Sequence, residues 1–199
     1  MSWIRLVDQD QAAGALKSLY GRIATPGGRI DNILKAHGLR PHTLEGHMAL
    51  YKSVLHHAGN RLPRAWLETL GVYVSHLNRC NYCVEHHFAG LKRLLGDDRR
   101  AHEVRAALES SELAGVFDER EQAMLSYARA LTRQPPTVVQ AQVEALRAAG
   151  LEDGEILEVN QVVAYFAYAN RTALGLGIST TGDALGLSPG STAADWRHC

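Results

Sequence analysis

Two cysteines, a histidine and a glutamate carry the side chains that could perform redox chemistry in this sequence. Cys80 and Cys83 are separated by two residues, and His87 follows Cys83 after three more. On a helix beginning near Cys80, positions i, i+3 and i+7 project from one face, so two thiols and an imidazole would form a line. A helix N-terminus stabilises a thiolate, and an imidazole one turn away can accept a thiol proton. The spacing therefore indicates thiol redox chemistry.

Glu68 precedes this motif on a segment with helical spacing. Its own-face neighbours Gly71, Val72 and Ser75 are small, which predicts room beside the carboxylate for a water and a ligand. A glutamate on a helix is, taken alone, an ordinary solvated residue. A catalytic role for Glu68 therefore depends on the motif that follows it.

The same residues allow plainer interpretations. The cysteines could bind structural zinc with His86 or His87, but a fourth ligand and a second Cys or His pair at finger spacing are missing. They could also be two small core residues. We expect His86 to face solvent or cap a helix. A further cluster of histidines is expected at the surface, without a role in metal binding: His37, His42, His47, His56 and His57.

The elements that position the motif are predicted to be helices. Apolar residues recur at helical spacing over 12–20, 43–57, 63–78, 81–95 and 119–131, and two further helices are expected over 138–149 and 153–170. Alternation typical of strands is scarce, so the fold class is all-α. The segment 153–170 is apolar on too many faces for a solvated helix, and we expect it in the core or at a subunit interface.

One domain over 1–181 is predicted, followed by a loosely ordered tail over 182–199 that is rich in Gly, Ser, Pro and Thr. A weak internal sequence repeat aligns Leu67-Glu68 with Leu157-Glu158, and in this alignment Asn170 corresponds to Cys80. It suggests a duplicated helical unit, with a motif-bearing first half over about 41–98 and a degenerate second half over about 117–178.

The composition limits which binding partners and which cellular compartment are expected. Lys plus Arg and Asp plus Glu both number 21 in 199 residues, and without long single-sign blocks neither nucleic acid nor an anionic membrane is an expected partner. We find neither a leader nor a membrane-spanning segment and expect a cytoplasmic protein. A Cys-x-x-Cys pair in a reducing compartment favours redox or metal chemistry, whereas the terminal Cys199 is not expected to function.

With Glu68, eleven intervening residues, Cys80-Asn81-Tyr82-Cys83 and then His87, the chain resembles the active-site signature of the alkylhydroperoxidase D-like group. This group belongs to the carboxymuconolactone decarboxylase superfamily. The stretches 79–95 and 165–177 resemble its peroxidase-related branch. Two departures accompany the resemblance. Tyr82 stands where the best-known peroxidases carry a second histidine, which bears on the rate and the proton route, and the motif falls before the midpoint of the chain, which indicates a different branch.

The resemblance implies a multihelical homo-oligomer, a trimer or hexamer, that works without a cofactor or metal. It implies that a hydroperoxide oxidises Cys83 to a sulfenic acid, that Cys80 resolves this to a disulfide, and that a thiol reductant restores both. Glu68 and His87 would relay the proton, with Tyr82 and His86 as possible auxiliaries. The helix-dipole argument favours Cys80 as the nucleophile, whereas the resemblance favours Cys83.

Other functions remain open at this point. The organic hydroperoxide could be replaced by a small disulfide as substrate, which would make the protein a thiol-disulfide oxidoreductase. A lactone decarboxylase or isomerase of the same superfamily would use acid-base groups without needing both thiols. A non-catalytic redox sensor would react once per site and stop, whereas an enzyme turns over with excess reductant and oxidant.

Overall fold

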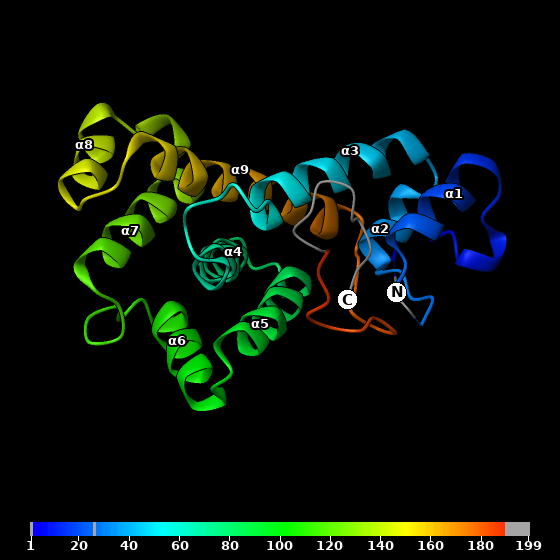
Figure 1. Ribbon diagram of the computed structural model, residues 1–199, viewed down its shortest axis with the longest axis horizontal. Helices are drawn as coiled ribbons and strands as arrows, with labels where there is room; N and C mark the ends of the chain where they lie inside the picture. The colour runs from blue at the N-terminus through cyan, green and yellow to red at the C-terminus, as the bar shows by residue number, and fades with distance from the viewer. Residues whose placement is uncertain (1, 26, 190–199) are drawn as a thin grey trace.

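The computed structural model describes residues 2–25 and 27–189, and this part of the chain is all-α, as the sequence predicted (Figure 1). No β-strand occurs among the described residues. A 3-10 turn at Gln9–Gln11, a π-turn at Lys52–His56 and a second 3-10 turn at Pro135–Thr137 accompany the α-helices. The helices are α1 (Gly14–Ile23), α2 (Asn32–His37), α3 (Pro41–Tyr51), α4 (Arg64–Leu77), α5 (Asn81–Leu95), α6 (Asp98–Ser110), α7 (Glu119–Arg133), α8 (Gln140–Ala148) and α9 (Asp153–Gly175).

Two of these helices, α2 and α6, were not predicted. Helix α2 has six residues, too few for a periodic pattern to stand out. Helix α6 is rich in charge and buries only Ala101, Val104, Ala107 and Leu108. Gly96 in the left-handed conformation ends α5, and the Asp97 side chain accepts a hydrogen bond from the backbone N–H of Arg100 to begin α6. Helix α5 therefore ends where the sequence predicted, and the residue after Gly96 begins a further helix.

Helix α4 forms the centre of the molecule. Eleven of its 14 residues are buried, and it packs against α5, α6, α7 and α9. In Figure 1 it is seen nearly end-on, with α9 running above it in this view and α5 beside it. A helix surrounded in this way holds its side chains in fixed rotamers. The residues that α4 contributes to a site are therefore rigidly placed.

The small residues of α4 serve helix packing, which corrects the expectation that they leave room for a ligand. A Cβ added at Gly71 would lie 2.3 Å from the Phe166 ring, so glycine is what lets α9 approach. One turn later, the Ser75 hydroxyl donates to the amide oxygen of Asn170 at 3.1 Å. This face of α4 is consequently filled by α9.

Helix α9 is partly a core helix, as expected, because Val159, Val162 and Phe166 are among its fully buried residues. Its other face exposes Leu157 and Leu174. The proposed internal repeat placed Asn170 opposite Cys80, but Cys80 lies at the junction of two helices, whereas Asn170 lies inside α9, which continues to Gly175. Neither α9 nor another helix in the described part of the chain is long and apolar enough to cross a membrane.

The segment 182–189, here called the strap, differs from the loosely ordered tail that its composition predicted. Asp183 accepts hydrogen bonds from the backbone N–H of Asn32 at the start of α2 and from the Tyr82 hydroxyl. The Asn32 side-chain amide donates to the carbonyls of Ser179 and Thr181. One buried carboxylate at a helix N-terminus thus fixes a segment of otherwise weak structural preference. Residues 190–199, with Cys199, lie outside the described residues.

Candidate active site

The cysteine pair lies at a tight junction between α4 and α5. The backbone N–H of Arg79 donates to His76 O and that of Cys80 donates to Ser75 O, which is the pattern of a Schellman motif. Arg79 takes the left-handed position of this motif with φ of 57°, where glycine is usual. Helix α5 begins at the next residue but one, so Cys80 becomes its N-cap.

The two thiols are reduced, buried and hydrogen-bonded to each other. The Cys83 thiol and the backbone N–H groups of Tyr82 and Cys83 donate to Cys80 Sγ, which lowers the pKa of Cys80 although burial opposes the shift. The same thiol-thiol hydrogen bond, together with burial, raises the pKa of Cys83 well above its ordinary value. In the resting protein Cys80 is therefore the more acidic thiol, as the helix N-terminus suggested.

Glu68 and His87 form a buried acid-base pair between α4 and α5. His87 Nδ1 lies 2.6 Å from Glu68 Oε2, and the two side chains are only 13% and 5% exposed. If Nδ1–H donates to the carboxylate, Nε2 keeps its lone pair for a proton. The Phe166 ring packs edge-on against the imidazole with centroids 4.6 Å apart. Glu68 is thus a buried partner of His87 and not the solvated residue it would be if taken alone.

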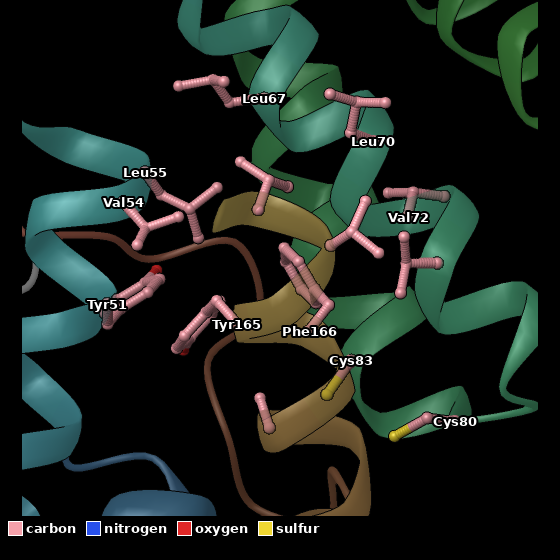
Figure 2. Close-up of a cluster of buried hydrophobic side chains, with 14 of the residues drawn as sticks. Tyr51, Val54, Leu55, Leu67, Leu70, Val72, Cys80, Cys83, Tyr165 and Phe166 are labelled. Atoms are coloured by element: carbon pink, nitrogen blue, oxygen red, sulfur yellow. The ribbon is translucent and has the colours of Figure 1, made fainter. Parts of the chain in front are cut away.

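Cys83, Glu68 and His87 line one small cavity of about 40 Å³. Its aromatic wall comes from Tyr51 and Tyr165, whose rings stack with centroids 5.6 Å apart, and burial raises the pKa of both phenols. Figure 2 shows Cys83 near Phe166, with Cys80 at the start of α5. Cys80 is not among the cavity residues.

The strap closes one side of the cavity through Gly186 and Leu187. A Cβ at Gly186 would lie 2.8 Å from the Ala89 carbonyl carbon and 2.9 Å from Gly90 N, so the strap rests directly on the α5 backbone. Gly90 in turn leaves space beside the Glu68 carboxylate, which is 3.8 Å from the position of its missing Cβ. The space beside the Glu68 carboxylate, which was expected from small residues of α4, is therefore provided by Gly90 of α5.

Comparison with known proteins decides the fold. No family model matches the sequence, and no curated protein matches it. Among solved structures, an uncharacterized peroxidase-related protein from Silicibacter sp. TM1040 superposes with a TM-score of 0.69 at 28% identity, over 76% of this chain and 77% of that one. A peroxidase-related protein from Ralstonia eutropha JMP134, described as an alkylhydroperoxidase AhpD core, gives a TM-score of 0.75 at 21% identity, over 89% and 91%. The chain has the alkylhydroperoxidase D-like fold.

A third solved structure carries a named activity. A variant of the debrominase Bmp8 in complex with 2,3,4-tribromopyrrole superposes with a TM-score of 0.68 at 16% identity, over 90% of this chain and 93% of that one. At this identity the likeness shows the shared fold alone. The alkylhydroperoxidase D-like fold is therefore common to proteins described as peroxidase-related and to a dehalogenating enzyme.

The chain has a second polar cluster, beside the cavity, that the sequence analysis missed. His86 Nε2 lies 3.1 Å from Asp183 Oδ2, and the Tyr82 hydroxyl donates to the same oxygen at 3.0 Å. The backbone N–H of Ile33 donates to the Tyr82 hydroxyl. His86 is thus buried, which corrects the expectation of a solvent-facing or capping role. Only spatial proximity identifies this cluster, because Asp183 is about a hundred residues away in sequence.

The residue types that could hold a metal ion lie in this cluster and not at the thiols. Ligand atoms of Asp31, His86 and Asp183 all fall within 4.8 Å of one another. Among the described residues, this is the one group of three or more potential ligands that lie close enough together to bind one ion. Neither cysteine belongs to it. The alternative of a zinc site built on the cysteines therefore finds no third ligand in the described part of the chain.

Two of the five histidines in the cluster over residues 37–57 also differ from expectation. His47 and His56 are 4% and 1% exposed, although all five were expected at the surface, whereas His42 and His57 are exposed. His47 lines the cavity and its ring lies 6.0 Å from that of Tyr165. The burial of His47 could have been predicted from the sequence, because the helical spacing of 43–57 places it on the same face as Leu44 and Tyr51.

Proposed function

We propose that this protein is a cofactor-free two-cysteine peroxidase. The observation that carries the proposal is the 2.6 Å pair of Glu68 and His87 lining the same cavity as Cys83, with Cys80 hydrogen-bonded to Cys83 from outside it. A nucleophile, a base and a group that orients the base are the requirements for an activated thiol. The second thiol supplies the two-electron partner.

The first step would consume the peroxide. The Cys83 proton passes to His87 Nε2, directly or through a cavity water, while Glu68 stabilises the imidazolium. The Cys83 thiolate attacks one peroxide oxygen, so that an S–O bond forms and the O–O bond breaks. The departing alkoxide takes the proton from His87 and leaves as an alcohol, and Cys83 becomes a sulfenic acid.

The second step would form the disulfide. Cys80 is the more acidic thiol, so it loses its proton more readily than an ordinary cysteine when the sulfenic acid appears. Its attack on Cys83 Sγ forms the S–S bond and expels hydroxide, which is protonated to water. The order of the two pKa values thus agrees with Cys80 as the resolving residue, and it explains why Cys83 needs the base pair of Glu68 and His87.

The cavity favours a small, uncharged hydroperoxide. A volume of about 40 Å³ holds roughly three water-sized molecules, enough for the peroxide oxygens and a short alkyl group. Asp31 and Glu68 line it and, among the described residues, no Lys or Arg does, so an anionic substrate such as a fatty-acid hydroperoxide would be repelled. A larger organic group requires the strap to move.

Reductive dehalogenation is a second candidate, favoured by the stacked rings of Tyr51 and Tyr165, which could accept a flat aromatic substrate. The same dithiol would supply two electrons, releasing halide and leaving a disulfide. The small cavity volume weighs against it, because a halogenated ring needs more space than the closed site provides.

We further propose a homo-oligomer that covers the exposed apolar residues of α9, with a thiol reductant as the partner that completes the cycle.

Peptide mapping and turnover test the proposal together. One equivalent of ethyl hydroperoxide should convert the reduced protein to a form 2 hydrogen atoms lighter, with one linkage between Cys80 and Cys83 in the same chain. Excess dithiothreitol should then sustain many turnovers. Linkages through Cys199 alone would remove the proposed mechanism, and a single oxidation without turnover would make the protein a sensor.

A further inference from the structure

The strap is held by its ends, and Asp183 is the first anchor. Its side chain is 1% exposed and accepts hydrogen bonds from the backbone N–H of Asn32 at 3.1 Å and from the Tyr82 hydroxyl at 3.0 Å. His86 Nε2 lies 3.1 Å from the same carboxylate. Asn32 begins α2, whereas Tyr82 and His86 belong to α5. One buried carboxylate therefore ties the strap to two helices.

The far end of the strap is anchored separately. Ser188 Oγ accepts hydrogen bonds from the guanidinium groups of Arg64 and Arg93 at 3.2 and 3.4 Å. Between the two anchors, none of the helices in the described part of the chain forms a hydrogen bond with residues 184–187. The strap residues that line the cavity lie in this stretch. Their position over the cavity therefore depends on the two anchored ends.

The strap is also the wall of the cavity that can move with the least disturbance of the core. All the other lining residues belong to helices or to the N-cap of α2, and packed helices open far less readily than a short irregular segment. The closed cavity holds about 40 Å³, whereas a cavity that binds benzene has roughly 150 Å³. An aryl group therefore enters only when the strap is displaced.

We propose that Asp183 and Tyr82 determine the size of the substrate, because they hold the strap over the cavity and so admit short alkyl hydroperoxides and exclude aryl hydroperoxides. This inference rests on the proposed function, since it concerns the oxidant of that reaction. Asp183 is a positioning residue that acts through Gly186 and Leu187 of the strap. Tyr82, inside the Cys-x-x-Cys turn, is the tether that joins this turn to the strap.

The equilibrium between closed and open strap sets the apparent affinity for a bulky substrate. A substrate that binds the open form alone has its apparent affinity reduced by the fraction of open molecules. Removing hydrogen bonds to a buried charged group shifts such an equilibrium by about tenfold or more. Cys83, Glu68 and His87 belong to α4 and α5 and stay in place when the strap moves. The change should therefore appear in KM and much less in kcat.

Two variants displace the strap, and each has a matched control. Asp183→Ala removes the first anchor, and Asp118→Ala removes a carboxylate that caps α7 outside the cavity. Gly186→Ala lifts the strap, because its Cβ would lie 2.8 Å from the Ala89 carbonyl carbon. Gly115→Ala is its control, since Gly115 has a φ of 81° against 79° for Gly186 but open space around it.

Steady-state turnover with dithiothreitol compares cumene hydroperoxide with ethyl hydroperoxide. We expect the ratio of the two kcat/KM values, aryl over ethyl, to rise about tenfold or more in Asp183→Ala and Gly186→Ala. The ratio should keep the parent value in Asp118→Ala and Gly115→Ala. Tyr82→Phe should raise it as well, and combining Tyr82→Phe with Asp183→Ala should give less than the product of the single effects, because both act through one anchor.

A second readout does not depend on peroxidase activity. In a background of Cys80→Ser and Cys199→Ser, Cys83 is the one cysteine left. Its alkylation by N-phenylmaleimide and by iodoacetamide is followed by intact mass. The rate with the aryl reagent, divided by the rate with the small reagent, should rise about tenfold when Asp183→Ala is added. Adding Asp118→Ala instead should leave this ratio at the parent value.

Several outcomes would overturn this inference. Unchanged ratios in variants that thermal unfolding shows to be folded would exclude the strap as the limit on size. An equal rise in Asp118→Ala would do the same, because general loosening of the fold would then explain the result. If Asp183→Ala does not fold, Asp183→Asn takes its place, since it keeps the shape and removes the charge.

The two readouts also separate this inference from the proposed function. A parent that reacts with neither hydroperoxide, together with a raised alkylation ratio in Asp183→Ala, would refute the peroxidase and leave the strap as the wall that limits access to Cys83. Peroxidase turnover with unchanged ratios would refute the strap alone. Slower turnover of ethyl hydroperoxide in Tyr82→Phe at an unchanged ratio would make Tyr82 a catalytic residue and overturn its place in the anchor.

Discussion

Replacing Glu68 with glutamine tests the acid-base pair with the least change in shape. The carboxylate is 5% exposed and 2.6 Å from His87 Nδ1, so the variant exchanges a short charge-assisted hydrogen bond for a neutral one. Hydrogen bonds to charged groups contribute about 1.5–3 kcal/mol, and each 1.36 kcal/mol corresponds to about tenfold in rate. We expect Glu68→Gln to slow sulfenic acid formation by roughly 10- to 150-fold.

Stopped-flow oxidation of the reduced protein by ethyl hydroperoxide measures this rate. Glu85→Gln is the matched control, because Glu85 lies on the outside of α5 and pairs with Arg105, and it should react at the parent rate. Thermal unfolding should show Glu68→Gln folded, since the change removes a buried charge. Raising the pH should narrow the gap, as hydroxide then forms the thiolate that the pair no longer supplies.

The companion variant His87→Ala should lose a similar factor. Because Glu68 acts through His87, the double variant should be far less impaired than the product of the two single losses. A Glu68→Gln variant that reacts at the parent rate across neutral pH would exclude the carboxylate from the mechanism. Multiplicative losses in the double variant would instead show that the two residues act separately.

Two further predictions concern the thiols and the packing of α4. In a Cys199→Ser background, ultraviolet thiolate absorbance should rise in two steps: the pKa of Cys80 is lowered, so it ionises first, below its ordinary value, and Cys83 ionises above it. Cys83→Ala removes the donor to Cys80 and should raise the pKa of Cys80, whereas an unchanged first step would contradict the proposed hydrogen bond. Gly71→Ala should lower the free energy of unfolding by about 1–3 kcal/mol, because its Cβ would lie 2.3 Å from an aromatic ring of α9. Gly46→Ala, at an open helix position, should raise it by about 0.5–1 kcal/mol in urea titrations, and equal effects of the two substitutions would refute the packing argument.

Local signals predicted the elements that carry the motif. The expected helix over 81–95 coincides with α5, because Cys80 at the N-cap and Gly96 in the left-handed conformation set its ends. The segment 63–78 agrees with α4 to within a residue at each end. Helix α6 was missed because its charged sequence gave too weak an apolar pattern, and its stability depends on a few small residues packed against α4 and α5.

The sequence by itself determined most of the helices and the position of Cys80, Cys83 and His87 along the start of α5, since these depend on local spacing. It could not determine the surroundings of these residues. The burial of Glu68, the closure of the cavity by the strap and the pairing of His86 with Asp183 join segments far apart in the chain. Such contacts are decided by which helices pack together, because close packing of whole faces is a property of the folded core and not of any one segment.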